Sequence, residues 1–224
     1  MASAYDKASL VMLPHVKKDG TLYSVKPEDR SGDFTFSRGS NLTATRVGPT
    51  GLIEKGRENL LLQSNQFDTT WAKTAITLTG GQSGYDGSLN AWEALGGGNS
   101  RVNQSVSNSG VQTFSIYAKA GTSDFIMLNL VGASDYKKWF DLSNGILGGD
   151  DGSAPIHASI DQVGTTDWYR CSIVVNDAIT LARFYVTDSD GITGATGTIY
   201  IQDAQLEVGL AATDYIESGA STGK

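Results

Sequence analysis

The chain has 224 residues, of which only 18% are charged and 27 are glycine, and its formal net charge is −7. Few charges, many glycines and few helix-forming runs favour an all-β domain with many turns. The negative charge argues against nucleic acid and against an anionic membrane as the main partner. A neutral glycan stays open as a partner, because its recognition needs no charge. No apolar run reaches the roughly 18 residues of a membrane span.

Residues 1–58 are predicted to form an extended segment that cannot fold alone. Ala8–Val16 is a short apolar run broken by Pro14, and Thr21–Val25 is a second short strand. Such a segment buries too little apolar surface for a core of its own. We expect it to become ordered by docking onto the following domain, a sister copy or another protein; disorder is the alternative. The first residues lack the basic and apolar regions of a signal peptide, which predicts synthesis in a cytoplasm.

Residues 59–217 are predicted to form one antiparallel β-sandwich of the jelly-roll, carbohydrate-binding-module type, followed by a flexible tail, 218–224. The run Val111–Ala118 alternates, so that Phe114, Ile116 and Ala118 face one side and Thr113, Ser115, Tyr117 and Lys119 face the other. Asn144-Gly145 supplies the positive φ angles of a tight hairpin turn. Short strands joined by Gly, Asn and Asp turns indicate a sandwich. We expect strands at 59–62, 76–78, 111–118, 125–131, 137–141, 168–175, 181–186 and 198–206.

Several motifs are predicted to be structural. Gly96–Gly98 lacks the strand and helix that flank a phosphate-binding loop, so we expect an ordinary loop there. The two histidines, His15 and His157, have no neighbours at zinc-ligand spacing. Cys171 is the only cysteine, so no intrachain disulfide is possible, and its apolar surroundings predict a buried thiol.

Aromatic side chains are the candidates for glycan binding, because a sugar stacks its apolar face on an exposed ring. We expect Trp71 and Trp168 in the core. Trp92 could lie in the core or at the surface. Both Trp92 and Tyr85 are candidates for glycan binding or for an interface. Tyr136 and Trp139 belong to a strand whose polar side holds Lys137 and Asp141, and this makes them the best exposed pair. Exposed Trp and Tyr side chains also suit a subunit interface.

Carboxylates give a weaker signal. Two acidic pairs lie in glycine-rich turns, where Asp is ordinary, so we predict no enzyme activity; glycan hydrolysis by facing carboxylates is the alternative. The pairs are Asp150 with Asp151 and Asp188 with Asp190. Asp203, with carbonyl oxygens near Gln66 to Asp68, is a candidate site for a structural Ca²⁺. The alternative is that Asp203 is a hydrogen-bonded or surface carboxylate. No other cofactor is predicted.

Three stretches resemble virion structural proteins of tailed bacteriophages, of the marine and cyanophage type, that carry a lectin-like jelly roll. The first is Tyr5–Pro14 with Lys18–Pro27. The second runs from Phe34–Ser40 to Asn59–Phe67 and Trp71. The third is Ile201–Gly209 with Ala212–Ile216. Between them, Phe114–Ala120 and Trp168–Ser172 are similar to the middle strands of that domain. Gly51–Glu58, which joins two of these motifs, is shorter than in many relatives.

The resemblance implies a non-enzymatic virion protein with the fold of a lectin. It implies a tail fibre or tail appendage that attaches to host-surface glycans as a homotrimer or higher ring. The first alternative is a capsid decoration protein, such as a head fibre or cement protein. The second is a secreted carbohydrate-binding module or glycan hydrolase. Docking to the other virion proteins is expected through residues of the first segment: Tyr5, Leu10, Met12, Tyr23, Phe34, Phe36 and Arg38.

Overall fold

The computed structural model describes residues 4–18, 21–35, 45–47 and 53–223. The chain divides into two compact units, Met1–Gly56 and Arg57–Lys224. The boundary falls two residues before the one predicted from the sequence.

The first unit consists of short strands held by main-chain pairing. After α1 (Ala4–Lys7), the strands β1 (Val11–Lys18), β2 (Thr21–Lys26) and β3 (Phe34–Thr35) form an antiparallel sheet in that order. Two further strands, β4 (Thr45–Val47) and β5 (Ile53–Lys55), pair with each other. Pro14 lies in β1, an edge strand, where a missing N–H is tolerated. None of the side chains described in this unit is buried.

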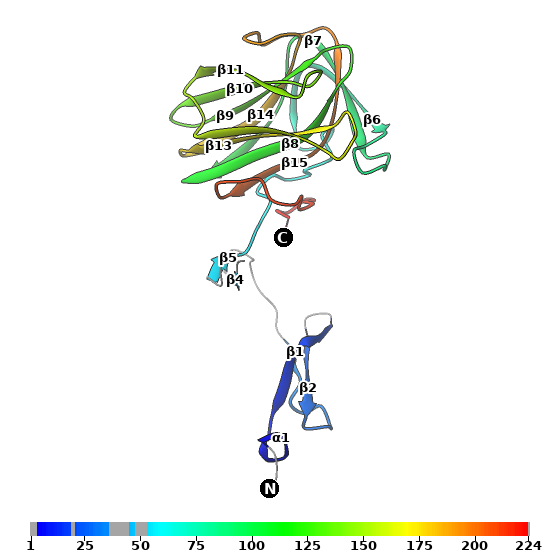
Figure 1. Cartoon of the computed structure of the whole chain (residues 1–224), viewed down its shortest axis with the longest axis vertical. Helices are drawn as coiled ribbons and strands as arrows, with labels where there is room; N and C mark the ends of the chain where they lie inside the picture. Colours follow the sequence, from blue (N-terminus) through cyan, green and yellow to red (C-terminus); the bar gives the residue numbers. More distant parts are fainter. Residues whose placement is uncertain (1–3, 19–20, 36–44, 48–52, 224) are drawn as a thin grey trace. The chain divides into compact units, whose positions relative to one another are not determined.

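The second unit is an antiparallel β-sandwich, as the sequence predicts. Its sheet has the order β11-β10-β9-β14-β7-β15-β8-β13-β12, and β6 adds to β7. Figure 1 shows β8, β13 and β15 side by side. The strands are β6 (Ala72–Gln82), β7 (Ala91–Asn108), β8 (Val111–Ala120), β9 (Phe125–Val131), β10 (Asp135–Asp141), β11 (Ile146–Gly152), β12 (His157–Gln162), β13 (Tyr169–Asn176), β14 (Ile179–Thr187) and β15 (Thr198–Val208).

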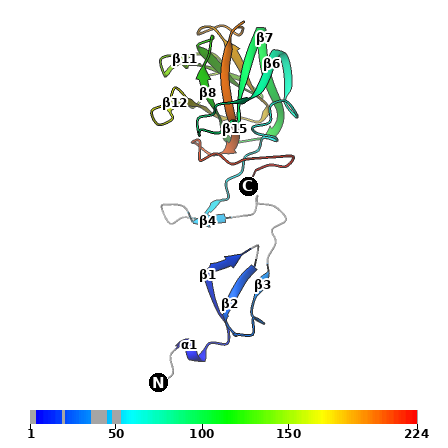
Figure 2. The same cartoon turned by 90° about the vertical axis from the view of Figure 1, so that its right-hand side faces the viewer.

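Strand β7 turns one continuous sheet into two layers. Its first half pairs with β15, as Figure 2 shows, and its second half pairs with β14. Gly96–Gly98 lies between the halves, so the prediction of a loop there is wrong. A Cβ atom on Gly96 would come within 2.6 Å of the Ala195 carbonyl oxygen, and Gly98 has a φ of 105°. The glycines therefore let the strand bend and let another segment approach closely.

The core lies between the two layers and is built by strand alternation. Phe114, Ile116 and Ala118 of β8 are all fully buried in it, as predicted. Trp71 is 2% exposed and packs in this core, as predicted. Trp168 is also buried, at 4% exposed, but it packs against Tyr85 on the outer face of the β15–β8–β13 layer. The opposite layer contributes alternate residues of β9 and β14: Ile126, Leu128, Leu130, Ala182, Phe184 and Val186.

The hairpin between β10 and β11 has its turn at the predicted place but not in the predicted form. Gly145 has a positive φ, 66°, whereas Asn144 does not, and the turn spans residues 142–145. The carboxylate of Asp141 accepts the backbone N–H groups of Ser143 at 3.0 Å and of Asn144 at 2.9 Å. The turn thus satisfies its own donors, as Asp does in an Asx-turn.

Backbone hydrogen bonds join the two ends of the second unit, an arrangement that no local sequence pattern predicts. Asn59 forms a two-way backbone bridge with Gly223, at 3.1 and 3.0 Å, in place of the predicted strand 59–62. Gln63 donates its backbone N–H to the Gly219 carbonyl oxygen at 2.8 Å. The C-terminal segment, red in Figures 1 and 2, therefore lies along the sandwich. Residues 218–223 are held by hydrogen bonds and do not form the predicted flexible tail.

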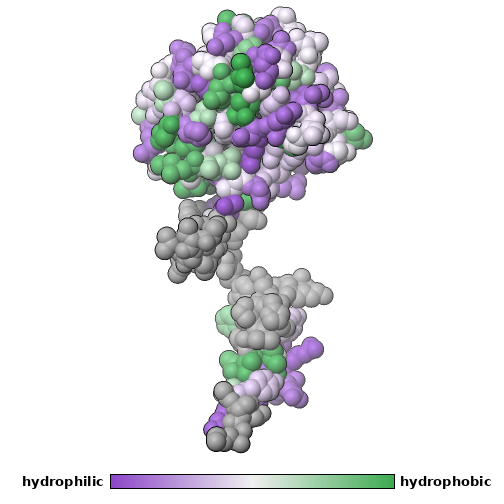
Figure 3. Space-filling view, in the orientation of Figure 1, coloured by the Kyte–Doolittle hydropathy of each residue, from purple (hydrophilic) through white to green (hydrophobic). Residues whose placement is uncertain are grey.

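The surface of the sandwich has no extended apolar area on the side drawn in Figure 3. Hydrophobic side chains there lie in separate patches between hydrophilic ones. Scattered apolar residues of this kind are normal on a protein surface. Among the described residues, no helix is long and apolar enough to cross a membrane.

Candidate functional site

The loop between β6 and β7 folds over β15 and carries Tyr85 to the outer face of the sheet. Gly84 approaches β15 so closely that a Cβ atom there would lie 2.1 Å from Gln202 Oε1. The backbone N–H of Tyr85 donates to the same oxygen at 3.2 Å. A glycine at position 84 therefore lets this loop dock on the strand.

A bulge in β15 directs the carboxyl group of Asp203 toward this loop. The pairing of β15 with β8 shifts between Gln202 and Gln205, and Asp203 has a φ of 53°. A bulge changes the direction of the side chains that it carries. The Tyr85 hydroxyl donates to Asp203 Oδ2 at 2.7 Å, and the backbone N–H of Asp203 donates to Asn65 Oδ1 at 3.0 Å. Three distant chain segments thus meet at Asp203, one at its carboxylate and one at its backbone N–H.

Burial raises the pKa of Asp203 to about 6. The hydrogen bond from Tyr85 opposes this rise, while the negative charges of Asp86 and Glu217 add to it. Burial, together with Asp203, also raises the pKa of Tyr85 far above its usual range. Tyr85 therefore keeps its proton at neutral pH, and Asp203 changes charge near neutrality.

Asp86 behaves in the opposite way. Burial alone would raise the pKa of Asp86, but hydrogen bonds from Ser88 and Gln202 outweigh it and lower that pKa below 3.8. Asp86 is exposed and therefore stays ionised at neutral pH. The loop thus places a permanent negative charge close to the titrating Asp203.

These groups line a polar hollow of about 270 Å³. Carboxylates, side-chain amides and phenol hydroxyls converge on it from the 59–67 segment, the β6–β7 loop, β15 and the C-terminal segment. Such a mixture of donors and acceptors suits a polyhydroxylated ligand. The lining residues are Asn65, Tyr85, Asp86, Asn90, Gln202, Asp203, Tyr215 and Glu217.

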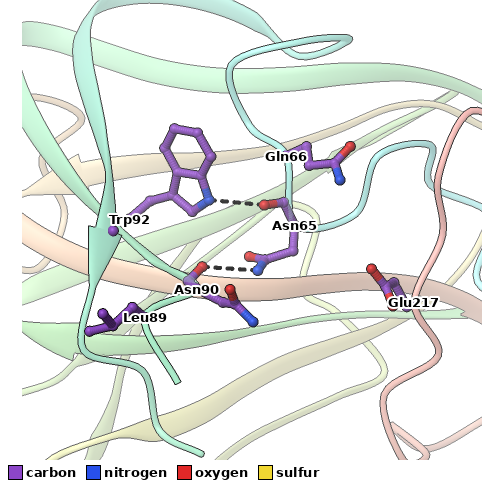
Figure 4. A pocket seen from close by; sticks show the side chains of 7 residues that line it. Asn65, Gln66, Leu89, Asn90, Trp92 and Glu217 are labelled. Atoms are coloured by element: carbon purple, nitrogen blue, oxygen red, sulfur yellow. Dashed lines mark hydrogen bonds between the residues drawn. The ribbon is translucent and has the colours of Figure 1, made fainter. Parts of the chain in front are cut away.

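A second hollow of about 240 Å³ shares Asn65, Asn90 and Glu217 with the first and adds the indole of Trp92. Figure 4 shows Trp92 and Asn65 joined by a hydrogen bond, in which Trp92 Nε1 donates to the Asn65 carbonyl oxygen at 2.9 Å. The amide of Asn65 donates in turn to the Asn90 carbonyl oxygen at 2.9 Å. Leu89 is 68% exposed at the rim. The two hollows form one candidate site, here called the double hollow.

The outer face of β15, β8 and β13 continues the double hollow as a row of rings and cations. The ring of Tyr85 stacks on Tyr117, with centroids 3.9 Å apart and planes at 12°, and lies 6.3 Å from Trp168. Lys119 Nζ lies 5.6 Å from the ring centre of Trp168 and 4.8 Å from that of Tyr200. Both distances are in the range of cation–π contacts. This ring row comprises Tyr85, Tyr117, Trp168, Lys119 and Tyr200.

The rest of that outer face is closed by the C-terminal segment. Thr113 Oγ1 donates to the Gly209 carbonyl oxygen at 2.9 Å. Glu207 accepts from the backbone N–H of Thr213 at 2.8 Å, and the backbone N–H of Ile216 donates to Gln205 Oε1 at 2.7 Å. Glu207 is only 2% exposed. The ring row is therefore the part of this face that stays partly open.

Trp139 corrects the main prediction for glycan binding. It is only 1% exposed and packs with Met127 and Tyr185 on the outer face of the other layer. Its Nε1 donates to the Ile192 carbonyl oxygen at 2.7 Å, so the loop after β14 covers it. Tyr136 is half-buried and packs against the main core. These two residues are therefore not an exposed pair, whereas Tyr85 and Trp92 meet at the double hollow.

The two residues of the predicted calcium site have other partners, and calcium binding stays a prediction. Asp203 is already bound by Tyr85 and Asn65. Asp68 is exposed, and its carbonyl oxygen accepts from Lys73 Nζ at 3.1 Å. Among the described residues there is no group of three or more His, Cys, Asp or Glu side chains placed to hold a metal. Asp203 and Asp68 alone do not supply the six or more oxygens that Ca²⁺ takes.

The acidic pairs take structural partners. Asp150 and Asp151 form ion pairs with Lys138 at 3.0 Å and with Lys137 at 2.6 Å. Asp188 accepts from Ser123 Oγ at 2.6 Å.

Two further predicted residues are placed as follows. Cys171 is fully buried as predicted, and burial raises the pKa of its thiol. His157 is exposed at the start of β12, and the side chain of His15 lies outside the described residues.

The predicted docking residues of the first unit are exposed where the structure describes them. Tyr5, Leu10 and Phe34 are 50%, 51% and 57% exposed, and Tyr23 is partly exposed. Phe36, Arg38 and the side chain of Met12 lie outside the described residues. Docking through them stays a prediction.

Sequence reasoning missed the polar half of the double hollow. It did not single out Asn65, Gln202 or Tyr215, because these ordinary polar residues acquire a role only through contacts made across the fold. Alternation in β8 did place Tyr117 and Lys119 on the outer side of the strand. Tyr85 and Trp168 were also singled out as aromatic residues, so Tyr200 is the member of the ring row that no pattern indicated.

No family model matches the sequence, and no curated protein matches it. Among solved structures, one similar chain is the N-terminal endo-1,4-beta-D-xylanase 10B of Clostridium thermocellum, comprising CBM22-1 and GH10 modules in complex with xylohexaose. The TM-score is 0.39 at 13% identity, over 72% of this chain and 29% of that chain. This chain thus spans less than a third of that protein.

Proposed function

We propose that this chain is a non-catalytic glycan-binding module that its first unit attaches to a larger assembly. The observation that carries the proposal is the double hollow, whose two parts share Asn65, Asn90 and Glu217 and add the indole of Trp92 at one part and Tyr85 of the ring row at the other. A sugar needs this combination of an apolar ring face and many hydrogen-bonding groups.

The chemistry of the double hollow fits neutral sugar units. Sugar hydroxyls donate to carboxylates and both donate to and accept from amides, and Asp86, Asn90 and Glu217 are all exposed for this purpose. The C–H face of a sugar ring packs on an aromatic side chain, which Trp92 and Tyr85 supply at the two parts of the site.

The setting that we propose is a bacteriophage particle, with the chain as a tail fibre or tail appendage that attaches to host-surface glycan. The sequence resemblance supports this setting. In the first unit, no described side chain is buried, which suits a segment that gains its stability from other virion proteins or from sister copies in a homotrimer or higher ring. Repetition in a ring would strengthen weak single contacts. A capsid decoration protein is the alternative setting.

One observation favours an enzymatic function, the hydrolysis of a glycan. Burial raises the pKa of Asp203 while hydrogen bonds lower that of Asp86, and glycosidases use two carboxyl groups of such different acidity. However, Asp203 is only 7% exposed and its Oδ2 accepts from Tyr85. We therefore assign Asp203 to holding the loop. Hydrolysis of a glycan that is lost in the variants D86N and D203N would overturn this assignment.

The direct test is binding to a glycan array, followed by calorimetry on the glycans that bind. Asn90→Ala and Asp86→Ala, both on exposed rim residues, should weaken binding by about tenfold each, the effect of losing one or two good hydrogen bonds. Ile156→Ser is the control, because Ile156 is 59% exposed and lies outside the site. Retention of no glycan at all would refute the proposal.

The setting has its own test. Imaging of whole particles should show a few copies in a ring at the tail; many copies over the head would favour the decoration protein.

A chain without residues 1–56 should stay folded but fail to join particles. Normal incorporation of that shortened chain would refute the attachment role of the first unit.

A further inference from the structure

Lys119 is a cation without a carboxylate partner in the part of the chain that the structure describes. No carboxylate oxygen there lies within 4.0 Å of its Nζ, whereas Lys137 and Lys138 each form such an ion pair. Its neighbours are the ring faces of Tyr200 and Trp168. Rings attract the positive charge but leave its three N–H donors with no strong acceptor.

Lys119 also lines a hollow of its own. This hollow, of about 250 Å³, is bounded by the ends of β8 and β13 and by the β10–β11 turn. The other lining residues are Ala120, Leu142, Ser143, Asp167 and Tyr169. Lys119 is half-buried, and its Nζ lies against the rings of Tyr200 and Trp168. A fixed, partly desolvated cation binds an anionic group more strongly than a freely moving surface lysine does.

Tyr85, Tyr117 and Lys119 link this hollow to the double hollow along the outer face. Tyr85 stacks on Tyr117, and Lys119 lies two residues after Tyr117 on the same side of β8. Trp168 is only 4% exposed and supports Tyr85 and Lys119 from beneath, at 6.3 Å from the Tyr85 ring and 5.6 Å from Lys119 Nζ. A short oligosaccharide over Tyr117 would reach from Tyr85 to Lys119.

We propose that Lys119 is an anion subsite, so that the ligand is a glycan bearing a carboxylate, sulfate or phosphate group. The inference rests on the proposed glycan-binding function and names its ligand class. The glycan lies along the ring row with its anionic group on Lys119 and a neutral unit in the double hollow.

The charges set the direction in which the glycan binds. Asp86 and Glu217 line the double hollow and repel an anion. On the ring row, Arg170 turns its guanidinium over Tyr117 and donates to Ser115 Oγ at 3.2 Å. Asp167 lies on the rim of the Lys119 hollow. Of the two cations, Arg170 and Lys119, Lys119 is the one that lines a hollow, and it is therefore the better placed to receive an anionic group.

The experiment uses the full chain and an array that pairs neutral glycans with uronate-, sulfate- and phosphate-bearing forms of the same backbone. The best pair is then measured by calorimetry at low and at physiological salt. Lys119→Met keeps the apolar stem on the rings and removes the charge, and Lys119→Arg keeps the charge. Lys73→Met removes the same charge from β6, outside the site, and is the matched control.

We expect the wild type to prefer the anionic member of a pair by about tenfold, the usual effect of a charge-assisted hydrogen bond. The preference should fall with salt, disappear in Lys119→Met, and persist in Lys119→Arg and Lys73→Met. The charged form that is preferred identifies the anionic group. Thermal unfolding of Lys119→Met close to that of the wild type shows that the loss is not one of folding.

Two results would overturn the inference, and they differ in whether the proposed glycan binding survives. Equal binding of the neutral and charged members, or a preference that survives in Lys119→Met, refutes the anion subsite and leaves glycan binding intact. Binding of neither member refutes the subsite and the proposed function together.

Discussion

The two layers of the sandwich both carry aromatic side chains on their outer faces, but loops cover these side chains to different extents. On the β9–β10–β14 layer, Trp139 packs with Met127 and Tyr185 under the loop after β14. On the β15–β8–β13 layer, the C-terminal segment covers one part of the face and leaves Tyr117 and Tyr200 half-exposed. The difference shows that a strand sets the direction of a side chain, while a remote loop decides whether that side chain meets solvent.

The largest expected effect tests this comparison directly. Trp139→Ala should lower the free energy of unfolding by about 3–5 kcal/mol, because it empties a sealed pocket. Tyr200→Ala should cost about 1 kcal/mol, because that ring is already partly in water. Urea unfolding measures both values. Equal losses in the two variants would contradict the contrast between the layers.

The next prediction concerns pH. The pKa of Asp203 is about 6 in the folded chain, raised by burial above 3.8, so the folded state binds this proton more tightly. The stabilisation that protonated Asp203 adds to the free energy of unfolding is fully present below pH 3.8 and is lost as the pH rises through 6. Asp203→Asn keeps an acceptor for Tyr85 without the charge. It should therefore exceed the wild type in stability at pH 7.5 by on the order of 2–3 kcal/mol.

The measurement is the difference in unfolding free energy between the wild type and Asp203→Asn from pH 4 to pH 7.5. Other carboxylates contribute equally to both proteins, so taking the difference removes their contributions. One of them is Asp141: hydrogen bonds lower its pKa, so that it stabilises the fold at higher pH, in the opposite direction to Asp203. A difference that does not change with pH would contradict the raised pKa of Asp203.

A smaller effect is expected at residues 219–224, which follow the part of the C-terminal segment that covers the β15–β8–β13 face. Removal of residues 219–224 deletes three backbone hydrogen bonds to Asn59 and Gln63. The loss should be roughly 1–2 kcal/mol, the sum for bonds that are partly replaced by water. Thermal unfolding of the shortened chain measures it, with Lys73→Met as a neutral surface control. An unchanged stability would restore the prediction of a free tail.

The smallest effect sharpens the comparison at the other layer. Asp190 accepts the Gly149 N–H with both carboxylate oxygens, at 2.8 and 3.0 Å, and ties the covering loop to β11. Asp190→Ala should cost about 1 kcal/mol and let the loop open more often. The indole N–H of Trp139 should then exchange faster with deuterium, measured by NMR. Unchanged exchange would show that the loop is held by other contacts.

Local patterns predicted those parts of the fold that depend on neighbours in the chain. Alternation placed Phe114 and Ile116 in the core, and Asn144-Gly145 marked the hairpin turn. The prediction for Trp139 was wrong because the carbonyl oxygen that covers it belongs to Ile192, 53 residues later. No local pattern carries that information.

The candidate site could be predicted only in pieces. Tyr85 and Asp203 were each singled out, one for glycan and one for calcium, but their hydrogen bond joins residues 118 positions apart. The bulge of β15 that brings them together depends on pairing with β8 and on Asn65. Strand register of this kind is a property of the assembled sheet, so Lys119 and Tyr200 could not be recognised as cross-strand neighbours from the sequence.

The bridge between Asn59 and Gly223 has a consequence for engineering. Because the two ends of the sandwich meet there, a short peptide linker could join them, and the chain could be reopened at the β12–β13 turn around Gly164, which is exposed and has a φ of 60°. Exposed turns with neighbouring termini tolerate circular permutation well. The same geometry lets the sandwich be inserted as a cassette into a surface loop of a host protein without stretching either chain.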